Sequence, residues 1–474
     1  MSYNIIKNTI FYSIGEIIPR IISFILLPIL TTYLTPAEYG INMYTNSVMI
    51  FVFVLASLSL NTFLLKNYYT IKDENSRKEL IGSIFLFIVL LNIVIVIFQI
   101  LFFPFIIDFF KINIPFKPFF LLAIFNNFFD VISLIPLVLF RVKEDALGFL
   151  IMSLSRTVLQ FVLIYVFVVI FKQGLEGSYY GRLYVNIPFG FIYFYYINRN
   201  GFLKINIKLI KQALLFSLPL LPGGLSFLLI SLSDRVILER FISLDKIGIY
   251  SVAMTLALVL NIVIQALYKT FEPILFKEHL NDNFQDTNLK LYKIYLFALF
   301  VGAFTASFFS KEFFMIATTG PFREAYEIVP FLLISVVISG INTYLGILMI
   351  ASNKQKIVSM ILIFSAIISV TLNFILIPFF GYYGAIVASS FSFLLTNFCY
   401  HYYVIIHKRY LITQIVLLVI VVLSPIIFDE FIFLDFILNF ILKIIISLLF
   451  IVVVFFAFDI DLKSLKHNFL NHKL

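Results

Sequence analysis

The stretch GEIIPRIISFILL, residues 15–27, lies in the first long apolar run of the chain and carries Glu16, Pro19 and Arg20. A helix surrounded only by lipid would contain none of these, because an ionisable side chain at mid-membrane costs about 2.5–3.5 kcal/mol on insertion scales. Glu16 and Arg20 are four residues apart, so they share one face of a helix. We therefore expect this face to meet protein or water.

The composition of the whole chain indicates that its solvent is lipid. Of its 474 residues, 62% are hydrophobic and 12% are charged, whereas soluble domains are about half apolar and a quarter charged. A soluble core cannot bury so much apolar surface, so we predict an all-α, polytopic membrane protein. Membrane topology explains the net charge of +9, which therefore does not indicate a nucleic-acid partner.

Fourteen apolar runs are long enough to be transmembrane helices. Of the 34 lysines and arginines, 20 lie on the side of the two termini and seven on the opposite side. This asymmetry predicts a multi-pass protein of the cytoplasmic (inner) membrane with both termini in the cytoplasm. All external connections are short, which argues against an enzyme with a catalytic domain outside the membrane. The expected spans are 9–34, 41–65, 81–103, 119–140, 148–171, 179–197, 213–238, 248–270, 291–310, 328–350, 358–378, 383–406, 411–427 and 437–457.

An internal repeat appears when the chain is shifted by 208 residues. The shift aligns Gly40, Ile41, Thr62 and Phe63 with Gly248, Ile249, Thr270 and Phe271. The copies share one orientation because six spans separate them, and such parallel repeats are typical of transporters. We predict two parallel six-helix lobes, 1–205 and 206–406, around a central cavity, with two peripheral helices and a basic cytoplasmic tail in 407–474. Chance similarity between two apolar stretches is the alternative.

Several spans carry polar residues at helical spacing on one face. Examples are the fifth span, with Ser153, Arg156, Thr157 and Gln160, and the eighth span, with Asn261, Gln265 and Lys269 followed by Glu272. Most of the charged positions among them are cationic, and a cavity lined by arginine favours an anion, phosphate in particular. The candidate substrate-binding residues are Arg20, Arg156, Arg182, Arg235, Asn261, Gln265 and Lys269. For each polar face the alternative is hydrogen bonding between helices, and Glu16 and Arg20 could also neutralise each other.

Two further features concern the helices themselves. The stretch FSLPLLPGG, residues 216–224, interrupts the seventh span, and its Pro219, Pro222, Gly223 and Gly224 predict a hinge. A static bend is the alternative. In the last span, Lys443 is expected to extend outward to the membrane surface.

Two segments of the chain resemble a known group of proteins. Residues 8–44, NTIFYSIGEIIPRIISFILLPILTTYLTPAEYGINMY, and residues 232–257, LSDRVILERFISLDKIGIYSVAMTLA, are similar to Wzx-type polysaccharide flippases. These belong to the multidrug/oligosaccharidyl-lipid/polysaccharide exporter superfamily. The resemblance implies two lobes formed by spans 1–6 and 7–12, with spans 13 and 14 attached. It also implies transfer of undecaprenyl-pyrophosphate-linked repeat units, with Arg20 placed to bind the pyrophosphate.

The first functional hypothesis is therefore a flippase that works by alternating access for O-antigen, capsule or exopolysaccharide synthesis, with a polymerase and a chain-length regulator as possible partners. We expect no cofactor, although H⁺ or Na⁺ could drive transport. Candidate coupling carboxylates are Glu16, Asp130, Asp234 and Glu272. A cation-coupled multidrug exporter is the alternative, which the cationic interior disfavours. A membrane-embedded polymerase is a second alternative, disfavoured because the chain has no large external loop.

Overall fold

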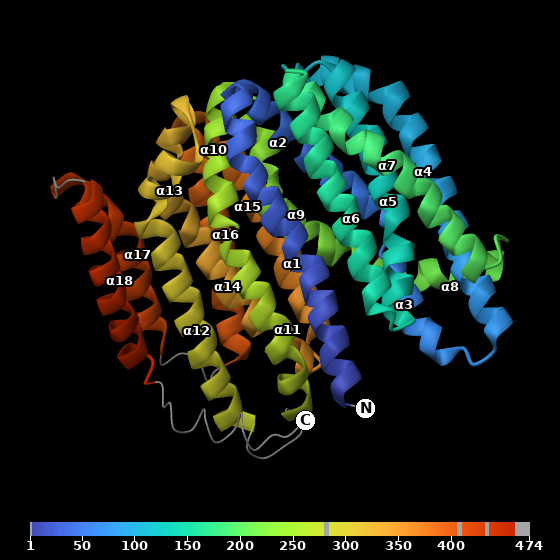
Figure 1. The fold of residues 1–474 in the computed structure, drawn as a ribbon. Coiled ribbons are helices and arrows are strands. Elements are labelled where there is room, and N and C mark those ends of the chain that lie inside the picture. The colour runs from blue at the N-terminus through green and yellow to red at the C-terminus, as the bar shows by residue number, and fades with distance from the viewer. Residues whose placement is uncertain (1, 279–283, 405–409, 432–435, 460–474) are drawn as a thin grey trace. The chain divides into compact units, whose positions relative to one another are not determined.

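The computed structural model describes residues 2–278, 284–404, 410–431 and 436–459 (Figure 1). These residues form helices and short connections with no strand among them, which confirms the predicted all-α class. The chain divides into two compact units. Unit 1 contains residues 1–228 and 235–248, and unit 2 contains residues 229–234 and 249–474. The division expected at residues 205 and 406 follows the sequence repeat and stays a prediction.

Unit 1 is built around α5, which packs against α2, α3, α4 and α7. Its apolar core joins residues of α2 to α5, including Leu60, Phe85 and Ile135. The helices of the first half are α1 (Ser2–Tyr33), α2 (Pro36–Ser57), α3 (Leu60–Thr70), α4 (Glu74–Phe110), η1 (Phe116–Phe120), α5 (Leu121–Val142), α6 (Ala146–Tyr165), η2 (Val166–Ile170), α7 (Gly174–Asn200), α8 (Ile207–Ser217), η3 (Leu218–Leu220) and α9 (Leu221–Leu238).

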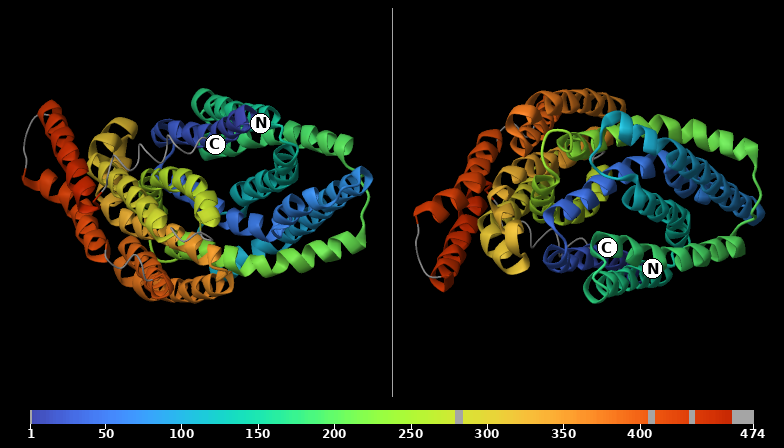
Figure 2. Two further views of the ribbon diagram at one scale, coloured as in Figure 1. Left: turned by 90° about the horizontal axis from the view of Figure 1, so that it is seen from below. Right: turned by 90° about the horizontal axis from the view of Figure 1, so that it is seen from above.

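Unit 2 is built in the same manner around α14, which packs against α11, α12, α16 and α17. The last two helices, α17 and α18, pack against α12 and lie at the edge of the unit, as predicted (Figure 2). The helices of the second half are α10 (Leu244–Ala257), α11 (Leu260–Glu278), α12 (Phe284–Phe308), α13 (Ser310–Ala317), η4 (Gly320–Glu327), α14 (Val329–Ala351), α15 (Gln355–Phe380), α16 (Tyr382–Tyr403), α17 (Leu411–Phe431) and α18 (Phe436–Ala457). Residues 460–474, most of the predicted basic tail, lie outside the described residues.

The helix boundaries confirm the internal repeat. Three helices of the first half, α2, α5 and α7, begin at residues 36, 121 and 174, and α10, α14 and α16 begin at residues 244, 329 and 382. Each pair differs by the 208 residues of the sequence shift. The repeat therefore extends over nearly the whole of each half, far beyond the few identical residues that reveal it.

Local sequence explains where several helices begin and break. Thr35 caps α2 in a capping box with Glu38. Asp73 caps α4, and hydrogen bonds from Ser76 lower the pKa of its carboxyl group. Between α8 and α9 the helix tightens into the 3₁₀ turn η3, which contains Pro219. The predicted bend at 216–224 is thus present, and its movement as a hinge stays a prediction.

Two glycines related by the repeat lie at a close crossing within unit 1. A Cβ atom on Gly40 would lie 2.3 Å from the backbone oxygen of Leu244, and one on Gly248 would lie 2.0 Å from that of Pro36. Only glycine permits backbones to approach so closely. The aligned glycines of the repeat thus hold the first turn of α2 against the first turn of α10.

Twelve helical segments of the described chain are long and apolar enough to cross a membrane. The remaining two of the fourteen predicted spans correspond to α7, with 27 residues, and α16, with 22 residues. Both are rich in Tyr; α7 also contains four Gly and three Asn, and α16 three Ser, so neither has a sufficiently apolar window. They begin at residues 174 and 382, which differ by 208, so both occupy the same position in the repeat.

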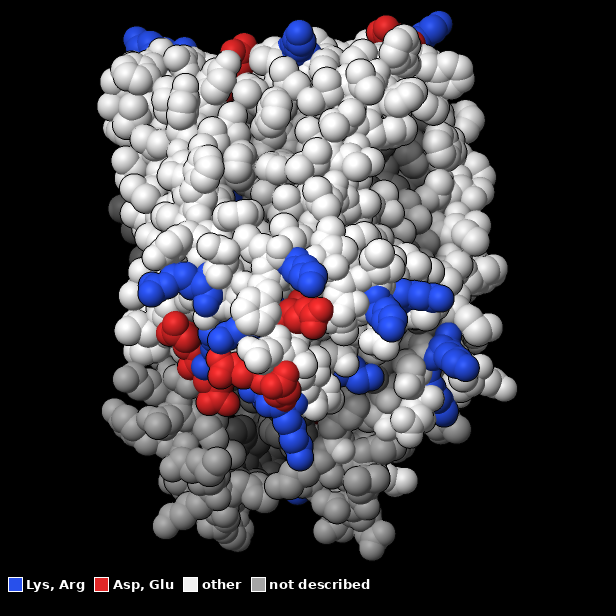
Figure 3. Space-filling view, turned by 90° about the vertical axis from the view of Figure 1, so that its right-hand side faces the viewer, with Lys and Arg blue, Asp and Glu red and all other residues white. Residues whose placement is uncertain are grey.

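The side of unit 1 that carries α4, α7 and α8 shows how charge is distributed (Figure 3). Charged side chains gather toward one end, and a broad uncharged zone separates them from a few at the opposite rim. Large apolar side chains such as Phe109 and Phe191 are 80% and 73% exposed. This arrangement is typical of a protein surrounded by the hydrocarbon of a bilayer.

Candidate functional site

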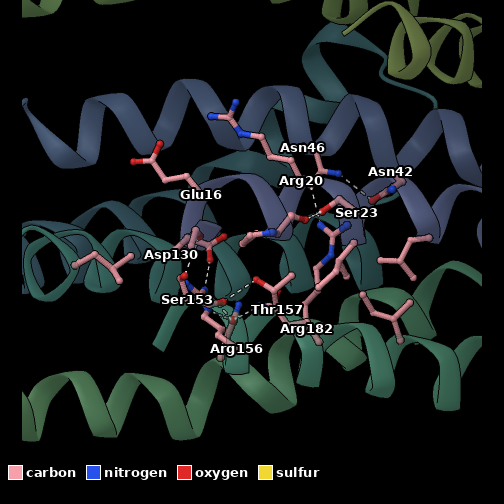
Figure 4. Close-up of a pocket in the computed structure, with 18 of the residues that line it drawn as sticks. Glu16, Arg20, Ser23, Asn42, Asn46, Asp130, Ser153, Arg156, Thr157 and Arg182 are labelled. Carbon is pink, nitrogen blue, oxygen red and sulfur yellow. Dashed lines mark hydrogen bonds and ion pairs between the residues drawn. The ribbon is translucent and has the colours of Figure 1, made fainter. Parts of the chain in front are cut away.

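Unit 1 contains a cavity of about 730 Å³ bordered by α1, α2, α5, α6 and α7 (Figure 4). Five residues predicted to bind substrate or couple ions, from four different helices, line it together: Arg20, Arg156, Arg182, Glu16 and Asp130. Arg141 also lines it, so the charged lining consists of four arginines and two carboxylates. The cavity is therefore cationic, as the sequence predicts for the protein interior.

The polar face of α6 forms one wall of the cavity. Its members lie within about two helical turns and all line the cavity: Ser153, Arg156, Thr157 and Gln160. The hydroxyl of Ser153 donates to the backbone oxygen of Gly15 at 2.9 Å, which joins α6 to α1. Helical periodicity correctly predicted this face, because all its members lie on one side of a single helix.

Two of the arginines are held by carboxylates. Arg141 at the end of α5 pairs with Glu16 at 2.8 Å between Nη2 and Oε1. Arg156 pairs with Asp130 across α6 and α5. Glu16 therefore pairs with an arginine from another helix, and the alternative in which Glu16 and Arg20 neutralise each other is wrong.

The other two arginines have no carboxylate partner in the described part of the chain. Arg20 is exposed and forms no hydrogen bond or ion pair with any side chain that the structure describes, and Figure 4 shows it extending on its own. Arg182 Nη1 makes one long contact of 3.5 Å with Asn46 Oδ1. Asn46 in turn donates to Asn42 at 3.0 Å. Arg20 and Arg182 are therefore available to an anionic ligand.

Asn186 connects the wall of the cavity to the interior of unit 1. Its Oδ1 accepts hydrogen bonds from Arg156 Nε at 3.1 Å, from Arg156 Nη2 at 2.8 Å and from Gln160 Nε2 at 2.7 Å. Its own amide nitrogen donates to Asn126 Oδ1 at 3.0 Å, and Asn126 donates to the backbone oxygen of Tyr179 at 3.2 Å. Asn186 is 1% exposed, so this network fixes the orientation of Arg156 and Gln160.

Three polar residues that line the cavity, Arg141, Asn42 and Asn46, are not among the site residues predicted from the sequence. Arg141 was counted with the cytoplasmic connection because it lies at the end of its span. Asn42 and Asn46 are four residues apart on α2, the same spacing that identified the face of α6. A search for uncharged polar pairs at this spacing would therefore have found them.

Two predicted site residues, Asp234 and Arg235, lie on α9 and are buried outside the cavity of unit 1. Asp234 is 2% exposed and accepts a hydrogen bond from the Tyr250 hydroxyl at 2.5 Å. Arg235 is 3% exposed. Glu239, four residues after Arg235, accepts the backbone N–H of Asn113 at 2.6 Å. Neither Asp234 nor Arg235 lines the cavity, and their roles in coupling and binding stay predictions.

The predicted polar face of the eighth span lies on α11 in unit 2. It carries Asn261, Gln265, Lys269 and Glu272, none of which belongs to the lining of the cavity in unit 1. Glu272 accepts a hydrogen bond from the Tyr268 hydroxyl at 2.7 Å. Substrate binding by the first three residues and ion coupling by Glu272 stay predictions.

Unit 2 contains a second group of charges, which we call the Lys443 cluster: Lys311, Glu312, Asp429 and Lys443. The Lys443 ammonium lies 3.0 Å from Glu312 Oε1 and 3.3 Å from Asp429 Oδ1, and it donates to the backbone oxygen of Phe308 at 2.9 Å. Lys311 lies 3.6 Å from Asp429. The side chain of Lys443 is 1% exposed, so the expectation that it extends outward is wrong. Carboxylates on α13 and α17 provide its partners instead.

Comparisons with known proteins identify the family of the chain and agree with its fold. A family model described as polysaccharide biosynthesis protein matches residues 5–279. The Lsg locus putative protein 1 of Haemophilus influenzae is 25% identical over 288 residues, which span 58% of this chain and 66% of that protein. The aligned part is thus slightly less than two thirds of that relative's length.

Solved structures share the fold at low sequence identity. The lipid II flippase MurJ in an inward closed conformation superposes with a TM-score of 0.72 at 15% identity and covers 94% of this chain and 98% of its own. A multidrug resistance MATE family transporter in an inward-facing conformation gives 0.65 at 12% identity, with coverage of 84% and 99%. The chain shares its overall fold with these two solved transporters, and since the family model matches more than half of the chain, the protein belongs to the polysaccharide biosynthesis protein family.

Proposed function

We propose that the protein transfers undecaprenyl-pyrophosphate-linked oligosaccharide repeat units across the cytoplasmic membrane by alternating access. The products would serve O-antigen, capsule or exopolysaccharide synthesis, with a polymerase and a chain-length regulator acting downstream. The family match and the flippase fold support this class of substrate. The observation that carries the proposal is the charge of the cavity in unit 1.

The charge of the cavity complements a diphosphate esterified at both ends. Such a group carries one negative charge on each phosphate, and the four arginines of the lining exceed its carboxylates by two. Arg20 and Arg182 are the two arginines without a carboxylate partner in the described chain. Guanidinium groups form forked, charge-assisted hydrogen bonds to phosphate, so these two would replace the water that the headgroup leaves behind.

The size and topology of the site also suit this substrate. A volume of about 730 Å³ is in the usual range for ligand sites and accommodates a diphosphate with its first sugars, while the prenyl chain remains in lipid. The excess of lysine and arginine on the side of the termini supports cytoplasmic termini. The headgroup would then enter from the cytoplasm, and the cavity would open to the other side after closure.

The proposal is tested by reconstituting the purified protein in liposomes that contain a fluorescent prenyl-diphosphate-linked oligosaccharide. Transfer to the outer leaflet is measured by quenching from outside. We expect the double variant Arg20→Gln/Arg182→Gln to lose transfer, because each charge-assisted hydrogen bond contributes about 1.5–3 kcal/mol. Arg199→Gln is the matched control, since Arg199 lies on the same helix as Arg182 but is exposed outside the cavity.

The same variants can be examined in cells. Lipid-linked repeat units should accumulate on the cytoplasmic face in the double variant and not in the control. Normal transfer and normal surface polysaccharide with both arginines removed would overturn the proposal.

A multidrug exporter is the second candidate, because transporters of the MATE family share the fold. Cationic drugs would need an acidic or aromatic site, and the cavity in unit 1 carries an excess of arginine. The two candidates are separated by a drug-resistance assay in a sensitive host. Resistance to cationic drugs that depends on Asp130 and persists in the arginine double variant would favour the exporter.

A further inference from the structure

The wall formed by α6 and α7 offers more hydrogen-bond donors than it has acceptors. A carbonyl oxygen has two lone pairs, but three N–H groups, two from Arg156 and one from Gln160, are directed at Asn186 Oδ1. Since Asn186 is buried, water does not relieve this competition from behind the wall. At least one donor is therefore available to an acceptor that enters the cavity.

An acceptor lies beside these donors. The Asp130 side chain is 49% exposed although it pairs with Arg156, whose side chain is 14% exposed. One carboxylate oxygen binds the guanidinium, and the exposed remainder can accept hydrogen bonds from a ligand. Donors and an acceptor thus lie side by side on a wall that the Asn186–Asn126 network holds in place.

A sugar hydroxyl requires this combination, since it donates one hydrogen bond and accepts others. A phosphate group accepts only, and the carboxylate of Asp130 would repel it. We propose that Asp130, Arg156, Gln160 and Asn186 form a sugar-recognition subsite, separate from the diphosphate site at Arg20 and Arg182. The inference rests on the proposed function, because the sugar is the one attached to the diphosphate.

The subsite also selects by charge. Asp130, which forms an ion pair with Arg156, turns its exposed part toward the sugar, so an uncharged sugar is accepted and an acidic sugar is disfavoured by repulsion between like charges. Asp130 is thus a specificity-determining residue of the cavity. Replacing its charge should alter which sugars bind without removing the arginines that hold the diphosphate.

The test measures affinity with short-chain probes and purified full-length protein in lipid nanodiscs. The probes are farnesyl diphosphate capped by a methyl ester, so that it carries the same two charges as a sugar ester, the farnesyl diphosphate esters of glucose, galactose and N-acetylglucosamine, and the ester of glucuronic acid. In the wild-type protein we expect at least one uncharged sugar to increase affinity about tenfold over the capped farnesyl diphosphate, the effect of one or two hydrogen bonds. The glucuronic acid ester should bind about tenfold more weakly than that uncharged ester.

Variants assign the effect to the subsite. Gln160→Glu keeps the shape but replaces donors by an acceptor. It should remove the gain from the uncharged sugar, measured as the ratio of the affinities for the sugar ester and for the capped farnesyl diphosphate in the same variant. Asp130→Asn should bring the two sugar esters to similar affinity. Thr157→Val is the matched control on the same face of α6, because the Thr157 hydroxyl is already bonded to the Ser153 backbone oxygen at 2.9 Å.

The outcomes separate this inference from the proposed function. If farnesyl diphosphate binds and requires Arg20 and Arg182, but no sugar adds affinity or Gln160→Glu leaves the gain intact, the subsite is wrong and the diphosphate site stands. Equal binding of acidic and uncharged esters by the wild type would remove the role of Asp130. If farnesyl diphosphate itself binds independently of the two arginines, the proposed function fails.

Discussion

The cavity in unit 1 and the Lys443 cluster in unit 2 both place charged side chains among apolar helices, but they differ in balance and in exposure. In the Lys443 cluster two lysines meet two carboxylates, and the Lys443 side chain is 1% exposed. In the cavity the arginines outnumber the carboxylates, and Arg20 is exposed. A balanced, buried group of charges holds helices together, whereas an unbalanced, accessible group can bind a ligand.

The largest effect on stability is expected from removing the central cation of the Lys443 cluster. Lys443→Met leaves the buried Glu312 without its cation and leaves Asp429 with Lys311 alone, and breaking a buried pair in this way costs about 3–5 kcal/mol. The free energy of unfolding is measured in detergent by recording circular dichroism during denaturation. Lys356→Met is the control, because Lys356 is exposed at the start of α15.

A second variant determines whether this loss arises from charge. Adding Glu312→Gln and Asp429→Asn to Lys443→Met removes the unpaired carboxylates, and most of the lost stability should return. If the triple variant is no more stable than Lys443→Met, packing rather than charge explains the effect.

A smaller loss is expected when only one carboxylate of the Lys443 cluster is neutralised. In Glu312→Gln the ammonium retains Asp429 and the backbone oxygen of Phe308, so we expect a decrease of about 1–3 kcal/mol in the free energy of unfolding. A loss as large as that in Lys443→Met would show that Glu312 alone balances the lysine.

A still smaller loss of stability is expected when the Arg156–Asp130 ion pair of the cavity is broken. Arg156→Met leaves Asp130 without its cation, but Asp130 is 49% exposed and water screens its charge, so we expect about 1–2 kcal/mol. Arg156→Lys keeps the positive charge and should recover part of this loss. A loss of stability equal to that of Lys443→Met would contradict the distinction between the accessible cavity and the buried Lys443 cluster.

The smallest effect is expected at Arg20. It forms no hydrogen bond or ion pair with a described side chain that its removal would break, so Arg20→Gln should change the free energy of unfolding by no more than about 0.5 kcal/mol. The same variant should nevertheless weaken binding of farnesyl diphosphate in nanodiscs. A strongly destabilised Arg20→Gln protein with intact binding would reverse the assignment of the two regions.

Periodicity and apolar length were sufficient to predict the helices, the repeat and the polar face of α6, because each depends on residues close together in the chain. The partners of charged residues could not be predicted in this way. Glu16 and Arg20 share a face of α1, yet Glu16 pairs with Arg141 of α5, since spacing gives the direction of a side chain but not what lies opposite. Lys443 was misjudged for the same reason. Its burial depends on carboxylates from α13 and α17 that only tertiary packing brings near.

Helices α7 and α16, which are equivalent in the repeat, have a consequence for how the protein is inserted into the membrane. The translocon releases a segment into lipid according to that segment's own apolarity, and neither helix contains a sufficiently apolar stretch. Each packs against the helix that precedes it in the chain, α6 or α15. We therefore expect α6 and α15 to enter the bilayer first. The more polar α7 and α16 would then insert by packing against them, so that insertion of each repeat is complete only after this last packing step.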